Sequence, residues 1–446
     1  AAAATDAPTV AAAATDAPTA APAATGGEQT VTTWYYFDQN NTDEQANERA
    51  GNAYLRRAIE KFNADNTGAL VWENAPQGYD LAAKLVTAVQ TDGDVPDVIG
   101  NFFDTDLRLY VRNNTIQDME WARSEPWFAD LNAQAVESCT VDGKLMCVPI
   151  SEASWMVAYF PDMYPNGFPA TPDDLLKEAA ALKADGKYAL TYWGNTAFDG
   201  EAVGRYFFMA LSSFGGGYDD GAGKMLLNRP ENVVAIEFMR EIVKNGYSPE
   251  SVFAGNFEEE ASFKGGTAGA FPTVYTVALN YLFPLTTPSG TAYATNTPKD
   301  MQDAIAAGDV KIAPFVAPAG QKPGCNLQLF GLAMPRTAQN VEGGKAYINW
   351  IMDPKNTIDW IVSTNGGFPT GAALQKDASF DTEMARQTRA ATDASACRPW
   401  YGSLDRIPEA KTIITNAIYD LIKTNPDADI AAALTSAQDE YNALPQ

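Results

Sequence analysis

Segments typical of strands alternate with segments typical of helices along nearly the whole chain from residue 30. The strand-like segments are short and rich in β-branched and aromatic residues. We predict them at 30–37, 70–72, 95–99, 157–160, 189–193, 268–271, 310–315 and 330–334. Because helices connect neighbouring strands in α/β sheets, this alternation predicts an α/β fold.

The helical segments show the spacing of apolar residues that places one face against a core. The first such face is formed by Tyr54, Leu55, Ala58, Ile59 and Phe62. A second helix is predicted at 80–90, and the chain from 341 onward is predicted to be mostly helical. Thr171, followed by Pro172 and two acidic residues, is typical of a capped helix start.

A chain of 446 residues is longer than one hydrophobic core usually accommodates, so we expect two lobes. Hydrophobic residues make up 46% of it, which suits a large core. No apolar run approaches the roughly 20 residues that a membrane-spanning helix needs, and we predict no such helix.

Net charge and the absence of histidine exclude several classes of function. The 56 acidic and 31 basic residues leave a net charge of −25, which repels phosphate backbones, so we expect no nucleic-acid partner. The chain has no histidine, which excludes Ser-His-Asp and Cys-His catalytic sites. Catalysis by carboxylates alone stays open, because glycosidases need only two.

The four cysteines suit two disulfides, because they form no C-x-x-C pair and no histidine could complete a zinc site. Cys139 and Cys147 flank a turn signal, and a three-residue loop from Asp142 to Lys144 would place them opposite each other in a hairpin. Cys325 and Cys397 then pair by elimination. Free buried thiols in a reducing compartment are the alternative.

The first 29 residues are predicted to form a flexible linker. The sequence AAAATDAPT occurs at 1–9 and again at 11–19, and side chains this small cannot offset the entropy of ordering the segment. A signal peptide is not recognisable in it. We expect a tether that anchors an exported lipoprotein to the membrane, with a low-complexity tail of no function as the alternative.

Motifs for nucleotides and metal ions are missing from the sequence. No glycine-rich phosphate loop has the required spacing, so we expect no cofactor. The oxygen-rich run at 38–44 lacks the glycine and terminal glutamate of a twelve-residue calcium loop, so we expect no metal site.

Aromatic and polar residues coincide where predicted strands end. These segments are 34–38 (WYYFD), 101–104 (NFFD), 192–195 (YWGN), 366–368 (GGF) and 398–401 (RPWY). Sugars need both kinds of side chain, because rings stack on their C–H faces while carboxylates and amides bind their hydroxyls. Open α/β sheets bind ligands at the carboxyl ends of their strands.

An ordered series of segments resembles the extracellular sugar-binding proteins of ABC importers, the family that includes maltodextrin-binding protein. The series is 59–62 (IEKF), 79–85 (YDLAAKL), 93–99 (GDVPDVI), 142–149 (DGKLMCVP), 157–162 (VAYFPD), 168–176 (FPATPDDLL), 263–271 (FKGGTAGAF), 331–335 (GLAMP), 346–352 (AYINWIM) and 365–370 (NGGFPT). The resemblance covers nearly the whole chain after residue 30.

The resemblance implies two α/β lobes joined by crossing strands, with a solute between them, as in a type II periplasmic-binding-protein fold. The expected division places 30–150 and 308–340 in lobe 1, and 151–307 and 341–446 in lobe 2. The solute-binding residues that it implies are Tyr36, Asp38, Asp104, Glu152, Trp193, Tyr275, Phe368, Trp400 and Tyr401.

The expected function is therefore binding of a sugar or oligosaccharide, without catalysis, and its delivery to the permease subunits of an ABC importer. We expect a monomer outside the cytoplasmic membrane, extracellular or periplasmic, held to it only by the linker. A carrier of polyamines or another small solute and a carboxylate-only glycoside hydrolase are the alternatives.

Overall fold

The computed structural model describes residues 29–43, 49–196, 201–255, 257–274, 279, 282–364 and 367–445. The side chains of Tyr79, Asp104, Glu201, Ala202, Thr273 and Val274 are not described. All of the predicted linker except Gln29 lies outside the described residues. None of the described helices is both long and apolar enough to cross a membrane.

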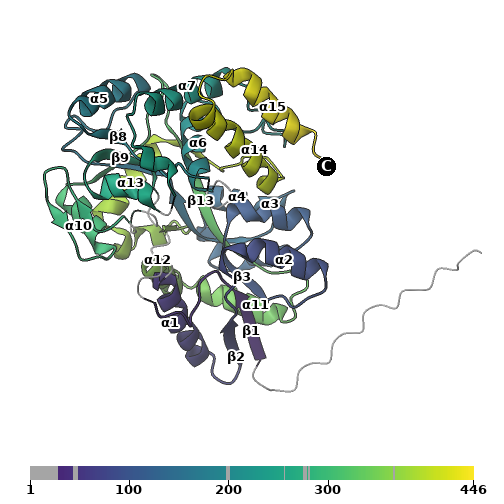
Figure 1. Ribbon diagram of the computed structural model, residues 1–446. Helices are drawn as coiled ribbons and strands as arrows, with labels where there is room; N and C mark the ends of the chain where they lie inside the picture. The colour runs from purple at the N-terminus through teal and green to yellow at the C-terminus, as the bar shows by residue number, and fades with distance from the viewer. Residues whose placement is uncertain are drawn as a thin grey trace, which may run out of the picture.

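Two sheets organise the chain, one in the lower half and one in the upper half of Figure 1. The first sheet has the order β14-β6-β13-β3-β1-β2, and β15 pairs with β13. Its strands are β1 (Gln29–Trp34), β2 (Leu70–Asn74), β3 (Val98–Phe103), β6 (Val148–Ser154), β13 (Gly324–Ala333), β14 (Phe368–Pro369) and β15 (Ala396–Arg398). β1, β2 and β3 run parallel, whereas β13 is antiparallel to β3 and β6.

The second sheet has four strands in the order β12-β7-β9-β8. They are β7 (Met156–Tyr159), β8 (Tyr188–Leu190), β9 (Ala268–Val274) and β12 (Lys311–Ala313). Short two-stranded pairs are formed by β4 (Thr140–Val141) with β5 (Lys144–Leu145), and by β10 (Leu285–Thr286) with β11 (Ala292–Tyr293). The α/β class predicted from the alternation is confirmed.

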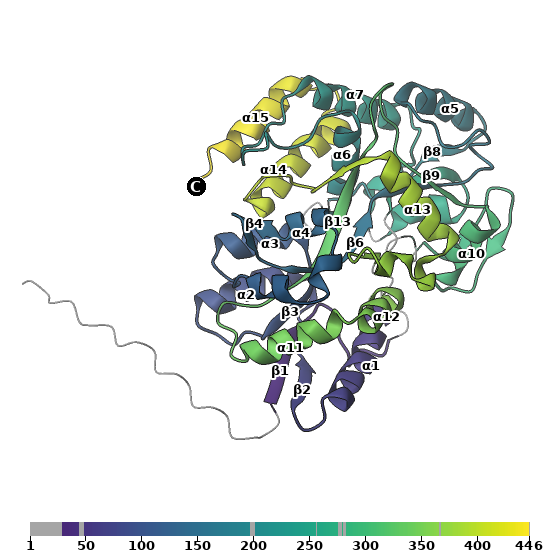
Figure 2. The same cartoon turned by 180° about the vertical axis from the view of Figure 1, so that it is seen from behind.

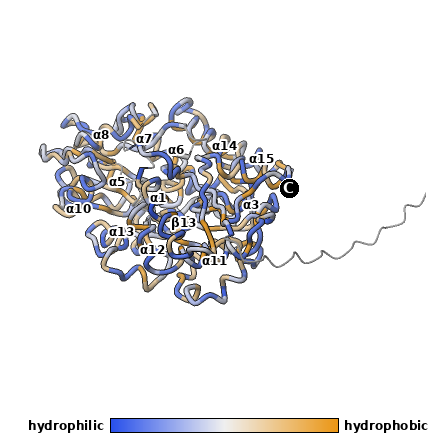
Figure 3. Tube along the Cα trace, turned by 90° about the horizontal axis from the view of Figure 1, so that it is seen from below, coloured by the Kyte–Doolittle hydropathy of each residue, from blue (hydrophilic) through white to orange (hydrophobic). Residues whose placement is uncertain are grey.

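Helices cover both sheets. Around the first sheet lie α1 (Arg49–Asp65), α2 (Leu81–Gln90), α3 (Asp104–Arg112), α4 (Ala133–Ser138), α11 (Val341–Ile351) and α12 (Pro354–Thr364). Around the second lie α5 (Pro172–Ala184), α6 (Glu201–Ser213), α7 (Pro230–Lys244), α8 (Ala261–Lys264), α10 (Lys299–Ala307), α13 (Glu383–Ala394), α14 (Ile407–Tyr419) and α15 (Ile430–Asn442). Hydrophilic and hydrophobic residues alternate along the outer helices (Figure 3), as expected when one face meets a core.

The predicted start of α5 is confirmed in detail. The side chain of Thr171 accepts a hydrogen bond from the backbone N–H of Asp174 at 3.2 Å, and Pro172 occupies the first turn. This bond pairs one of the amide groups that every helix start leaves without an intrahelical partner.

Both faces of the second sheet are buried, which explains the apolar run from Met156 to Phe160. Val157 and Tyr159 belong to a core shared with α6, α7 and α14, whereas Met156, Ala158 and Phe160 belong to a core shared with α8 and α10. Alternate residues of a strand point to opposite faces, so a strand covered on both sides needs apolar residues at every position.

The chain passes between the sheets along neighbouring strands. It leaves the first sheet at Ser154, where β6 leads directly into β7, and it returns along β13. It leaves again after β14 and reaches β15 by way of α13, which packs on β12 and α10. Figure 2 shows β13 and β6 running through the centre of the molecule.

The contacts differ from the predicted division into lobes. α11 and α12 pack against β1 and α1, and Tyr347 and Trp360 lie in the core of the first sheet, whereas 341–446 was predicted to belong to lobe 2. β12 pairs with β7 in the second sheet, whereas 308–340 was predicted to belong to lobe 1. We propose instead that 29–153 and 327–380 form the first lobe, and 155–326 and 383–445 the second.

Both predicted disulfides are present, and the described residues include no free cysteine. The hairpin loop is shorter than predicted. Val141 pairs with Lys144, so the loop has only Asp142 and Gly143, whose positive φ values of 51° and 77° suit a tight hairpin turn. Cys147 is therefore offset from Cys139 along the hairpin, at a Cα–Cα distance of 5.0 Å that a disulfide still spans.

Candidate functional site

Aromatic and amide groups meet at the carboxyl edge of the first sheet. Asn101 donates from Nδ2 to the Tyr36 hydroxyl at 2.8 Å, and the rings of Tyr36 and Phe103 stack with centroids 6.2 Å apart. The ring of Phe330 on β13 lies 5.4 Å from that of Phe103. Tyr36 and Phe103 are partly exposed. This group, Tyr36, Asn101, Phe103 and Phe330, is called the edge cluster below.

Polar side chains continue from the edge cluster along β13. Asn326 and Gln328 alternate with Leu327 and Leu329, so they share the face of the strand on which Phe330 lies. Gln328 accepts a bond from Nε1 of Trp155 at 3.4 Å. The Asn326 side chain is fully buried, and neither of its polar atoms has a partner among the described residues. The sequence analysis missed these residues, although their period of two was a visible signal.

Glu152 lies partly buried on the opposite face of the crossing strands. Its carboxylate accepts hydrogen bonds from Asn132 at 2.8 Å and from Gln375 at 3.2 Å. Burial raises the pKa of Glu152, and the bonds from these two amides oppose the rise. Phe368 stands opposite Glu152 in the strand register, and its ring is buried beneath the guanidinium of Arg389. Glu152 and Phe368 therefore lie on neighbouring strands inside the first lobe.

Trp193 and two glutamates lie beyond the carboxyl end of β8. Trp193 donates from Nε1 to Glu260 at 3.1 Å, and Glu260 forms an ion pair with Lys264 at 3.1 Å. Burial raises the pKa of Glu260, and the charge of Lys264 opposes this. Glu259 accepts from Asn195, and its other carboxylate oxygen is buried with no hydrogen-bond partner among the described residues.

Trp400 and Tyr401 lie in the core of the second lobe. Trp400 is 1% exposed, meets Trp155 edge-on at 4.8 Å and stacks on Tyr401 at 4.9 Å. In this arrangement neither face of the Trp400 ring is open to a solute. Its role as a stacking platform stays a prediction that burial disfavours.

Of the remaining predicted site residues, only Asp38 has a described side chain. Asp38 lies next to the edge cluster, but its carboxylate accepts a bond from the backbone N–H of Asn40 at 2.8 Å and so stabilises its own turn. The Asp104 side chain and the whole of Tyr275 lie outside the described residues. In the described part of the chain, no group of three or more acidic or cysteine residues could hold a metal ion.

Comparison with known proteins decides the family. A family model described as bacterial extracellular solute-binding protein matches residues 57–388, which is more than half of the chain. The chain belongs to this family. The resemblance inferred from the ordered segments is thereby confirmed. No curated protein matches the chain in sequence.

Solved structures of solute-binding proteins share the fold. Maltose-bound MalE3 of T. maritima is 19% identical and has a TM-score of 0.73, with 93% of this chain and 99% of that chain covered. The cyclic alpha-maltosyl-1,6-maltose binding protein of Arthrobacter globiformis is 18% identical (TM-score 0.69), with coverages of 93% and 98%. A ribitol complex from Agrobacterium radiobacter K84 is 20% identical (TM-score 0.68), with the same coverages. The two-lobed solute-binding fold is thus shown.

In this solute-binding protein, ion pairs connect helices of the two lobes. Arg108 of α3 binds Asp405 at 2.7 Å, and Arg112 lies 3.8 Å from Glu409 of α14. Figure 1 shows α14 directly above α3.

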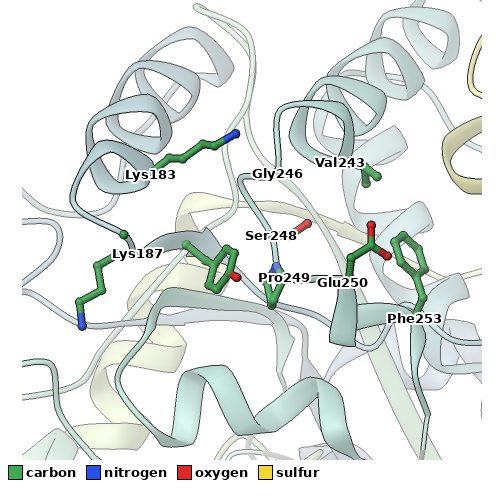
Figure 4. A pocket seen from close by; sticks show the side chains of 10 residues that line it. Lys183, Lys187, Val243, Gly246, Ser248, Pro249, Glu250 and Phe253 are labelled. Carbon is green, nitrogen blue, oxygen red and sulfur yellow. The ribbon is translucent and has the colours of Figure 1, made fainter.

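One concave pocket of the described residues contains no residue of the edge cluster. It encloses about 380 Å³ on the outer side of the second lobe, between the ends of α5 and α7 (Figure 4). Lys183 donates to the carbonyl of Asn245, Lys187 to that of Gly266 at 3.3 Å, and Glu250 pairs with Lys423 at 2.6 Å. Because these charged side chains of the pocket already have partners within the protein, we do not assign the solute to the pocket.

The partly buried carboxyl of Glu152 gives a testable pH dependence. Its pKa is raised on folding, so the folded chain holds this proton more tightly, and stability falls as pH rises from the unfolded towards the folded pKa. We expect the difference in unfolding free energy between the natural protein and Glu152→Gln to decrease from about pH 4 to pH 7. Any constant cost of the new amide cancels in this comparison.

Urea denaturation at several pH values measures this difference. Glu73→Gln is the matched control, because Glu73 is exposed and the substitution removes the same charge. If the difference in unfolding free energy between the natural protein and Glu152→Gln does not change with pH, the assignment of a raised pKa to Glu152 is contradicted.

Proposed function

We propose that the protein binds a sugar or oligosaccharide between its two lobes and delivers it, unchanged, to the permease subunits of an ABC importer. The observation that carries the proposal is the edge cluster, where two partly exposed rings and an amide lie at the carboxyl edge of a sheet. Rings of this kind stack on sugar C–H faces, and open α/β sheets bind ligands at this edge.

The family and its neighbours support this proposal. The family consists of extracellular solute-binding proteins, and two similar solved structures are bound to maltose and to ribitol. The two disulfides suit an oxidising compartment outside the cytoplasm. We propose that the chain works there as a monomer tethered by its N-terminal segment.

Calorimetric titration with a panel of mono- and oligosaccharides tests the proposed function. Saturable binding of at least one sugar that is recovered intact is the expected result. Binding of none, or release of shorter sugars above background, would overturn it, and the second outcome would favour a carboxylate-only hydrolase.

Phe103→Ala tests the edge cluster directly. Loss of the ring should lower sugar affinity by about 1–3 kcal/mol, roughly ten- to a hundredfold, on the scale known for stacking of rings on nucleic-acid bases. Phe128→Ala is the matched control, because Phe128 is also a partly buried ring against the first core but lies outside the edge cluster. Equal losses in both variants would place the solute elsewhere.

A second candidate solute carries an amine, such as a polyamine. The observation that favours it is the buried carboxylate oxygen of Glu259, which has no hydrogen-bond partner among the described residues, while the neighbouring Glu260 pairs with Lys264. A protonated amine would supply both the missing donor and the missing charge. Spermidine in the same titration panel decides between the two: tight binding of spermidine without sugar binding selects this candidate.

A further inference from the structure

A second cavity, called the basic cavity below, lies beside the crossing strands. It encloses about 350 Å³ and is lined by Ser212, Gly215, Gln321, Lys322, Ala396 and Arg398. These residues come from the end of α6, the turn that precedes β13, and β15. Two of them are cationic and none is acidic, although the chain as a whole has a net charge of −25.

Arg398 is a partly buried cation in the wall of this cavity. It donates from Nη2 to the carbonyl of Gly216, and its guanidinium lies 5.5 Å from the centre of the Phe208 ring. Burial lowers the pKa of Arg398, Asp219 opposes this, and the like charge of Arg229 adds to it. The surroundings therefore penalise its charge more than they compensate it.

Asp219 is the acid whose charge acts most strongly on Arg398, but its carboxylate is hydrogen-bonded to other groups. Its carboxylate accepts from the backbone N–H of Ser403 at 2.8 Å, from the hydroxyl of Ser403 at 2.5 Å and from the backbone of Gly221 at 3.2 Å. Within the described residues Arg398 forms no ion pair closer than 4.0 Å, and neither does Lys322, which is exposed. Donors on both cations are thus available to a ligand.

We propose that the basic cavity binds a small oxyanion, that is, a carboxylate, phosphate or sulfate group. A planar guanidinium binds such groups through two parallel N–H bonds, and a lysine adds a second charge. Arg398 is partly buried and has no ion-pair partner among the described residues, so an anion that enters the cavity gains an interaction that the protein itself does not supply. The outer pocket of Figure 4 differs, because Lys183 and Lys187 already donate to backbone carbonyls. Its glutamate, Glu250, already pairs with Lys423.

The position of the basic cavity gives the bound anion a mechanical role. Asn326 and Arg398 are directly paired in the register of β13 and β15, next to the Cys325–Cys397 disulfide. An anion held by Arg398 and Lys322 would link β15 to the turn before β13, where the chain turns back towards the first sheet. Oxyanion binding would therefore stabilise the strands that connect the two lobes.

Titration with inorganic phosphate at constant ionic strength, followed by calorimetry, tests this proposal, with acetate and citrate as separate arms. We expect saturable binding to the natural protein, at least about tenfold weaker in Arg398→Gln and weaker in Lys322→Gln. Binding in the phosphate arm alone, the carboxylate arms alone, or both identifies the preferred oxyanion.

Lys355→Gln is the matched control, because it removes the same charge from an exposed site on α12. If Arg398→Gln fails to fold, Lys322→Gln still tests the cavity, since Lys322 is exposed. The proposal is overturned if the natural protein shows no saturable binding, or if Lys355→Gln weakens binding as much as Lys322→Gln does.

Discussion

Replacing Trp400 by alanine is expected to lower the free energy of unfolding by about 3–5 kcal/mol. The ring is 1% exposed and is held between Trp155 and Tyr401, and its edge closes against the backbone of Gly204. Removing it leaves a cavity that these neighbours cannot fill without moving. Urea denaturation of the solute-free protein measures the loss.

Sugar affinity measured on the same variant separates a core role from a site role. If Trp400 belongs to the core, affinity should change little under conditions in which the variant is folded. Unchanged stability together with weakened sugar binding would instead place the ring in the solute site. Trp350→Ala serves as the comparison, because Trp350 is only partly buried and should cost less.

Removing the Cys325–Cys397 disulfide should cost more stability than removing Cys139–Cys147. The two bridges span 72 and 8 residues, and in the chain-entropy model a longer loop loses more freedom in the unfolded state. The expected costs are about 4 kcal/mol and about 2–3 kcal/mol respectively. Denaturation of the two paired Cys→Ala variants measures both.

Equal costs for the two bridges would contradict the entropic account. The stability that the longer bridge contributes would then come from the native state, in which it joins β15 to β13 beside the crossing strands. Cys139→Ala with Cys147→Ala is the internal control, because that bridge closes only a local hairpin.

Features that depend on local sequence could be predicted. The cap at Thr171 and both disulfides follow from residues near one another or from counting, and several strands were found to within a few residues. The strand β6 was not predicted, and β13 begins at Gly324 whereas the predicted strand begins at residue 330. The loop between Cys139 and Cys147 was wrong by one residue, because Asp142 and Gly143 both adopt positive φ and close the turn sooner. Boundaries of this kind depend on backbone conformations that many sequences permit.

Features that depend on long-range packing could not be predicted. The helical period of α11 and α12 shows that each has an apolar face, but it does not show which sheet that face covers. The same limit applies to the site: Phe103 ends a strand and Trp400 comes shortly after one, yet Trp400 lies in a core and Phe103 at an edge. A ring is apolar in either place, so composition alone does not separate them.

The route of the chain between the sheets has a consequence for the order in which the protein folds. β13 lies between β6 and β3 in the first sheet, and α11 and α12 complete its core, so residues 29–153 lack a central strand until residue 333 has been synthesised. Pairing of strands so far apart in the sequence is slow, because the chain loses the entropy of loop closure before the strand contacts form. The first sheet of the growing chain therefore stays incomplete during most of its synthesis, until the whole of β13 is available to pair with β3 and β6.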